Sequence, residues 1–120
     1  MRSLARSRFE EMASDALDTL PAALASKVSN LHITIEDEPD REIEGEDSRI
    51  LGLYEGIPLT ERDGGYFGVL PDRITLFKRN LEREAADIGE LAELIRTTII
   101  HEIAHHFGID DHRLDELGWS

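Results

Sequence analysis

The sequence predicts an α+β protein in which one helix and several short strands precede a long, buried helix. Three observations favour this class: an amphipathic segment near the start, alternating β-branched segments in the middle, and an apolar stripe at helical spacing near the end. A length of 120 residues is typical of one domain, and neither repeats nor an interdomain linker are visible. We therefore expect a single domain over residues 1–120.

The first helix is expected over residues 4–20, where apolar residues recur at helical spacing and acidic residues occupy the other face. Pro21 interrupts this helix and begins a short second turn through Ala25. Residues 31–35 alternate and are β-branched, which predicts a strand. Residues 36–47 contain eight acidic residues and predict a solvated loop, with a bound cation as the alternative.

Three further strands are expected, at residues 50–56, 66–69 and 73–77. Between the first two, the turn-rich segment 57–65 contains Asp63-Gly64, a common hairpin signal. After the third strand, Asn80 is placed to cap a short helix over residues 81–86.

The long helix is expected from Gly89 to Phe107 because one apolar stripe recurs at spacings of three and four. The stripe consists of Ile88, Leu91, Ile95, Ile99 and Ile103. Leu94, Ile100 and Phe107 widen the apolar surface, so the helix should be buried at the centre of the protein. Gly108 is placed to end it, and residues 111–117 predict one or two final helical turns.

Charge and composition exclude several classes of function. With 26 acidic and 13 basic residues the formal net charge is −13, which disfavours nucleic acid and anionic membranes as partners. No apolar run approaches the roughly 20 residues of a membrane span. The basic start, residues 1–8, leads directly into acidic residues without an apolar signal core, so we expect a cytoplasmic protein. Without cysteine, any metal must be bound mainly by His, Asp or Glu.

Four of the five histidines fall between positions 101 and 112. His101 and His105 are four residues apart on the predicted helix, so they lie on one face and two imidazoles can converge on one metal ion. Glu102 lies beside them, close enough to reach an activated water without binding the metal. This combination predicts a metal site with a carboxylate beside it.

A metal held by two histidines of one helix needs a third ligand from elsewhere. Gly108 allows the chain to turn after the helix, and three residues later Asp111 can return to the metal. Asp110, His112 and Glu116 are the competing ligands, with His112 second because imidazole suits zinc. The ligand types favour Zn²⁺ as the cofactor.

The string His101-Glu102-Ile103-Ala104-His105-His106-Phe107-Gly108-Ile109-Asp110-Asp111 resembles the metzincin pattern His-Glu-x-x-His-x-x-Gly-x-x-His/Asp of the zincin metallopeptidases. Residues 97–119 and the overall length resemble small bacterial zincin-like proteins. The resemblance implies a minimal zincin-like fold, in which a small mixed β-sheet packs on a backing helix and an active-site helix. It implies Zn²⁺ bound by His101, His105 and Asp111, Glu102 as the general base, and a peptide or flexible protein segment as substrate.

Two departures from the pattern bear on activity. Metzincins have a methionine turn beneath the metal, whereas Met1 and Met12 are the only methionines of this chain. With nine residues after Asp111, we expect almost none of the subdomain that forms the lower wall of a zincin cleft. We expect a shallow, open site, or one that a second copy of the chain completes.

Three functions follow from these observations: a zinc-dependent peptidase, a zinc-binding module or adaptor without turnover, and a hydrolase of small amides. In a peptidase the oxyanion needs a further donor, for which the candidates are His106, His112, Arg113 and Tyr66. The substrate backbone would pair with an edge strand, either residues 66–69 or residues 73–77.

Overall fold

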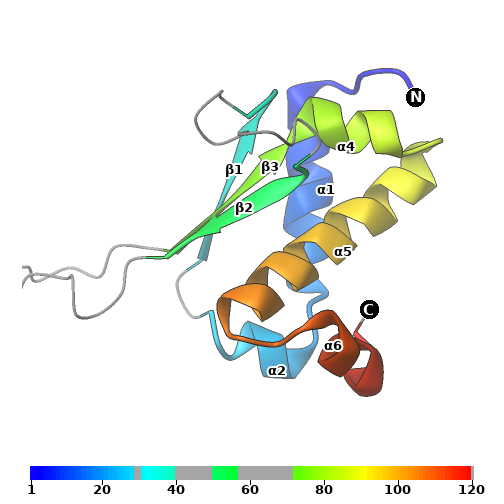
Figure 1. Ribbon diagram of the computed structural model, residues 1–120. Helices are drawn as coiled ribbons and strands as arrows, with labels where there is room; N and C mark the ends of the chain where they lie inside the picture. Colours follow the sequence, from blue (N-terminus) through cyan, green and yellow to red (C-terminus); the bar gives the residue numbers. More distant parts are fainter. Residues whose placement is uncertain (29–30, 40–49, 57–71, 120) are drawn as a thin grey trace, which may run out of the picture.

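The computed structural model describes residues 1–28, 31–39, 50–56 and 72–119. Within these ranges, the helices lie on one side of a small sheet (Figure 1). The elements in chain order are α1 (Arg6–Asp18), α2 (Ala22–Ala25), β1 (Leu31–Glu36), β2 (Gly52–Glu55), β3 (Asp72–Phe77), α4 (Lys78–Glu84), α5 (Ile88–His106) and α6 (Asp111–Leu117).

The sheet has the strand order β1-β3-β2. Strand β1 is parallel to β3, with Ile33 opposite Ile74, whereas β2 is antiparallel to β3, with Tyr54 opposite Ile74. Because residues that lie opposite each other share a face, Gly52 and Tyr54 of β2 lie on the same face as the buried Ile74 and Leu76. The expected α+β class, with a small mixed sheet packed on helices, is confirmed.

Helix α5 is the centre of the core, as the apolar stripe predicts. Asp87 caps its start by accepting a hydrogen bond of 2.8 Å from the backbone N–H of Glu90. Its buried residues are Leu91, Ile95, Thr98, Ile99, Ile100, Ile103 and Ala104. The stripe fails at its first member, because Ile88 is 46% exposed at the N-terminal end, and Phe107, beyond the last turn, is 39% exposed.

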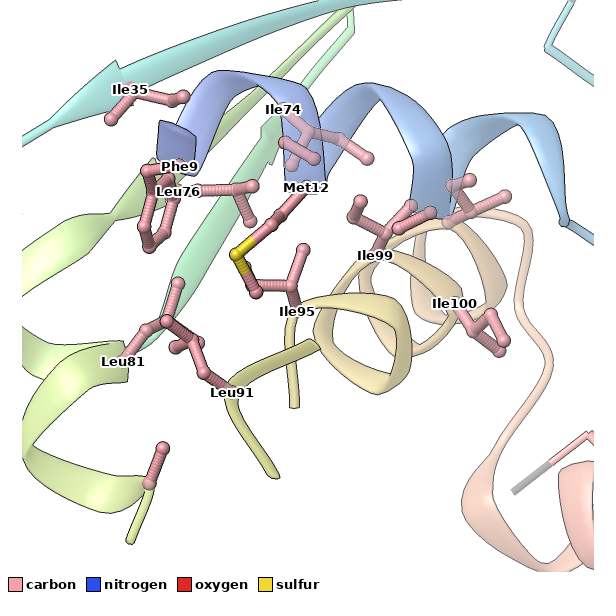
Figure 2. Packing of buried hydrophobic residues seen from close by; sticks show 14 of the residues in the cluster. Phe9, Met12, Ile35, Ile74, Leu76, Leu81, Leu91, Ile95, Ile99 and Ile100 are labelled. Carbon is pink, nitrogen blue, oxygen red and sulfur yellow. The ribbon is translucent and has the colours of Figure 1, made fainter. Parts of the chain in front are cut away.

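Helix α1 backs the sheet and packs beside α5. Figure 2 shows apolar side chains of α1, β3 and α5, among them Met12, Leu76 and Ile95, converging between these elements. At the start of α1, the Arg6 guanidinium donates a hydrogen bond to the backbone carbonyl of Ile35 and so joins the helix to β1. Burial of this shared apolar surface is the main stabilising contribution to such a fold.

The expected cap at Asn80 is wrong. Helix α4 begins at Lys78, directly after β3, and has no side-chain cap. Asn80 is buried within the helix, and its side-chain amide donates to the backbone carbonyl of Ile50 at 2.8 Å. A long-range partner for this amide therefore replaces the local capping bond that the sequence suggested.

The remaining boundaries differ little from the predicted ones. Helix α1 is shorter than the predicted segment 4–20, and β2 covers the central four residues of the predicted strand 50–56. Most of the acidic segment 36–47, the hairpin turn at 57–65 and the strand at 66–69 lie outside the described residues. Among the helices that the structure describes, none combines the length and apolar character needed to cross a membrane.

Candidate functional site

His101, Glu102 and His105 lie in the last turns of α5, where the sequence pattern put them. The two imidazole rings have their centroids 5.8 Å apart, at an angle of 41°. His101 is partly buried, and its Nε2 atom is inaccessible to solvent and has no hydrogen-bond partner among the described residues. A buried imidazole nitrogen without a partner is costly, and a ligand is one explanation for it.

A tight turn at Gly108 redirects the chain after α5. Gly108 has φ +78°, in the left-handed region. The Ile109 N–H donates to Ala104 O at 2.8 Å, and the Gly108 N–H donates to His105 O at 3.1 Å. This pair of bonds is the Schellman arrangement, which favours glycine at the left-handed position. The sequence prediction that Gly108 ends the helix is confirmed.

The turn brings Asp111 to the end of α5. Asp111 is the first residue of α6, and its Oδ1 accepts a hydrogen bond of 2.9 Å from His105 Nε2. This bond holds the pKa of the Asp111 carboxyl below its usual range. The neighbouring Asp110 is the cap of α6, accepting from the Arg113 N–H at 2.9 Å, so the two adjacent aspartates have different roles.

The other candidate ligands make contacts within α6. His112 is 85% exposed, and its Nε2 lies 2.9 Å from Glu116 Oε1. The Arg113 guanidinium donates to Glu116 Oε2 at 3.0 Å. Tyr66, a candidate oxyanion donor, lies outside the described residues.

Glu102 is partly buried and contacts the sheet. Its Oε1 accepts a hydrogen bond of 3.0 Å from the backbone N–H of Tyr54 in β2. Burial raises the pKa of the Glu102 carboxyl, while the Tyr54 N–H and the nearby His105 and His101 oppose that rise. A carboxylate with a raised pKa accepts protons more readily than an exposed one, as a general base requires.

Tyr54 also connects β2 to the end of α5 through its side chain. Its ring stacks on the ring of His106, with centroids 4.0 Å apart and an angle of 19°. Its hydroxyl donates to Asp72 Oδ2 at 2.6 Å, and burial, followed by this bond, raises the pKa of Tyr54 well above its ordinary value. A Cβ atom at Gly56 would lie 2.8 Å from His106 Cε1, so the strand approaches this ring closely.

Tyr54 and Asp72 were not predicted from the sequence to be part of the site. One signal was present: Gly52, Tyr54 and Gly56 alternate on one face of a predicted strand, and glycines in a strand often mark a close approach of backbone to a neighbour. His106, a candidate oxyanion donor, lies with its ring against Tyr54.

His101, His105 and Asp111 are residue types that bind zinc, but their side chains do not converge on one point in the structure. Two imidazoles and a carboxylate are a usual zinc donor set, and His101 Nε2 is buried without a partner among the described residues. The 2.9 Å between His105 Nε2 and Asp111 Oδ1 is a hydrogen-bond distance, so these two groups contact each other directly. In the described part of the chain, however, no group of three or more His, Asp or Glu residues is arranged to hold a metal ion.

Comparisons with known proteins concern the family and the fold of this chain. The profile of the family described as zincin-like metallopeptidase matches residues 28–119. A conserved hypothetical protein from Thermo thermophilus has a similar structure, with a TM-score of 0.53 and 21% sequence identity, over 95% of this chain and 97% of the other. At that identity the likeness concerns the fold alone. No curated protein matches the sequence.

Proposed function

The chain belongs to the zincin-like metallopeptidase family, and from this premise we propose that it is a zinc-dependent peptidase with Glu102 as its general base. One observation supports this most directly: a partly buried carboxylate with a raised pKa lies on the same helix end as two histidines, and a turn returns Asp111 to one of them. Zinc ligands and a base are the minimum that metal-assisted hydrolysis requires.

In the proposed site His101, His105 and Asp111 hold the ion, in the aspartate version of the metzincin pattern. When bound, zinc supplies an electrophile that activates water and polarises the scissile carbonyl. Glu102 accepts a proton from the attacking water through its carboxylate. It then delivers that proton to the leaving amine, so that the carboxylate is regenerated as the C–N bond breaks.

The exposure of the site suggests the class of substrate. The side chains of His105 and Asp111 are 49% and 74% exposed, so the described residues form an open surface and not a deep pocket. A surface of this kind suits an extended peptide or a flexible segment of a protein, which can bring its own backbone to the ligands.

A zinc-binding module without turnover is the second candidate. It is favoured by one contact between two of the proposed ligands, because His105 bonds Asp111 directly. The two functions differ in their dependence on Glu102, because only hydrolysis needs the carboxylate as a base.

Metal content tests the site first. Elemental mass spectrometry of the wild type should find about one zinc ion per chain, with loss in both His105→Ala and Asp111→Ala. His32→Ala, which removes an exposed histidine of β1, is the matched control and should keep its zinc. If Asp111→Ala keeps its zinc, another residue is the third ligand. A wild type that binds no added zinc would overturn the proposal.

Turnover is tested on zinc-loaded protein with a library of unstructured peptides. Glu102→Ala should keep its zinc and lose about 10²–10⁴-fold in kcat, because it lacks the base and retains the ligands. Cleavage that is equal in wild type and Glu102→Ala, or absent from both at full zinc loading, would favour the binding module.

A further inference from the structure

The contacts of Tyr54 join three parts of the molecule that the chain separates widely. Its backbone N–H donates to Glu102 of α5, its hydroxyl to Asp72 of β3, and its ring stacks on His106. We propose that Tyr54 is the positioning residue for Glu102: its fixed amide holds one oxygen of the carboxylate and leaves the other for the reaction. This inference rests on the proposed peptidase function for its catalytic meaning.

The direction of the Tyr54 N–H follows from the strand register. The Phe77 N–H donates to Leu51 O at 3.0 Å, so Leu51 and the alternate residues of β2 direct their backbone groups toward β3. Tyr54 lies three residues after Leu51, so its backbone groups point in the opposite direction. Its N–H is therefore directed to the outer edge of the sheet. The Glu102 carboxylate accepts a hydrogen bond of 3.0 Å from this N–H.

The side chain of Tyr54 fixes the position of that amide. The ring is clamped on its face by His106 at 4.0 Å, and its hydroxyl is held 2.6 Å from Asp72 Oδ2. Strand β2 is further restricted where Gly52 lies against Thr98, since a Cβ atom at Gly52 would be 2.9 Å from Thr98 Cγ2. The amide thus belongs to a strand that is held against α5 at more than one point along its length.

A hydrogen bond to one oxygen restricts the side-chain rotation of a carboxylate. Glu102 bonded through Oε1 keeps Oε2 for the proton transfer, whereas a free glutamate samples several rotamers. Because a displacement of about 1 Å can cost about a hundredfold in rate, loss of this contact should lower kcat and leave substrate affinity largely unchanged.

Amide hydrogen exchange tests the contact without any need for activity. The full chain is compared with Glu102→Ala, and Leu53, which faces β3, serves as the internal reference. Exchange at Tyr54 should become about tenfold faster in Glu102→Ala, since a hydrogen bond to a charged acceptor is lost, while Leu53 stays constant. His32→Ala should leave both rates unchanged. Unchanged exchange at Tyr54 in Glu102→Ala would overturn the inference.

Kinetics at equal zinc loading test the consequence. Tyr54→Ala removes the ring, and Tyr54→Phe keeps the ring that stacks on His106. We expect Tyr54→Ala to bind zinc as the wild type does and to lose about 10–100-fold in kcat with KM within about twofold, and Tyr54→Phe to recover most of the loss. Equal kcat in all three proteins would overturn the positioning role. If the wild type itself cleaves nothing, the peptidase proposal fails, and the exchange experiment still decides whether Tyr54 holds Glu102.

Discussion

Replacing Gly108 by alanine tests whether the turn after α5 is what holds Asp111 near His105. Gly108 has φ +78°, and a Cβ atom built there would meet nothing within 4 Å. The cost of alanine is therefore conformational and not steric. An L-residue in the left-handed region costs about 1–2 kcal/mol, so the free energy of unfolding of the metal-free chain should fall by about that amount.

Zinc affinity should fall together with stability. Asp111 is exposed and contacts His105 through one hydrogen bond, so a strained turn at residue 108 can relax and release it. Where the turn relaxes in the metal-free chain, zinc binding has to restore the strained turn, so the part of the roughly 1–2 kcal/mol that the metal-free chain escapes is lost from the free energy of zinc binding. Since about 1.4 kcal/mol corresponds to a factor of ten, the zinc Kd should rise by up to about tenfold, and by less where the metal-free chain has already lost that stability.

Two other glycines provide matched controls. Gly118, with φ +75° and no atom within 4 Å of the place that an added Cβ would take, ends α6, so Gly118→Ala carries the same strain after the ligand and not before it. Gly89 lies within α5 without a positive φ, and Gly89→Ala should stabilise the chain by about 0.5–1 kcal/mol. Stability is measured by urea denaturation and zinc Kd by competition with a chromophoric chelator. Equal zinc affinity in Gly108→Ala and Gly118→Ala would refute the reasoning.

Three further substitutions test the scaffold, each by urea denaturation. Gly52→Ala should cost about 1–3 kcal/mol, because its methyl group would lie 2.9 Å from Thr98 Cγ2, and adding Thr98→Ser should recover part of that loss. Lys78→Met should cost about 3–5 kcal/mol by removing the buried cation 2.9 Å from Glu82 and leaving that carboxylate with the Ser3 hydroxyl and the Leu4 N–H as donors, whereas replacing both Lys78 and Glu82 with apolar residues should cost less. Ile99→Ala should cost about 2–5 kcal/mol, since Ile99 is fully buried, and a loss below about 1 kcal/mol would contradict its central place in the core.

The candidate ligands could be found from sequence because their arrangement is local. His101, Glu102 and His105 share one helix, whose geometry fixes their relative directions once the apolar stripe has located it. The turn to Asp111 is equally local, since it depends on a glycine at one position and on bonds within one segment. The sequence favoured Asp111 and left Asp110 as a competing ligand, because either aspartate could have capped α6; the structure has Asp110 as the cap and Asp111 beside His105.

The partners of Glu102 could not be found in this way. Tyr54 is 48 residues from Glu102, and the contact depends on the register of β2 and on which of its residues direct their N–H outward. Composition and periodicity locate a strand without fixing its register against a helix. The same limit explains Asn80. Its sequence position suits a cap, but its side-chain amide donates a hydrogen bond to the backbone carbonyl of Ile50, 30 residues away.

The proposed ligands and the proposed base are supported by different parts of the fold, and this makes their contributions separable. Asp111 depends on the turn at Gly108, whereas Glu102 depends on the amide of Tyr54 in the sheet. Gly108→Ala should therefore weaken zinc binding without changing amide exchange at Tyr54, and Tyr54→Ala should change kcat without changing the zinc Kd. In the double variant the zinc Kd should match that of Gly108→Ala alone and the kcat that of Tyr54→Ala alone, each to within about 0.5 kcal/mol, although the Tyr54 ring contacts His106 and Phe107 just before the turn. A larger coupling would mean that the turn and the strand act on one another through α5, and the separate roles assigned to Gly108 and Tyr54 would have to be abandoned.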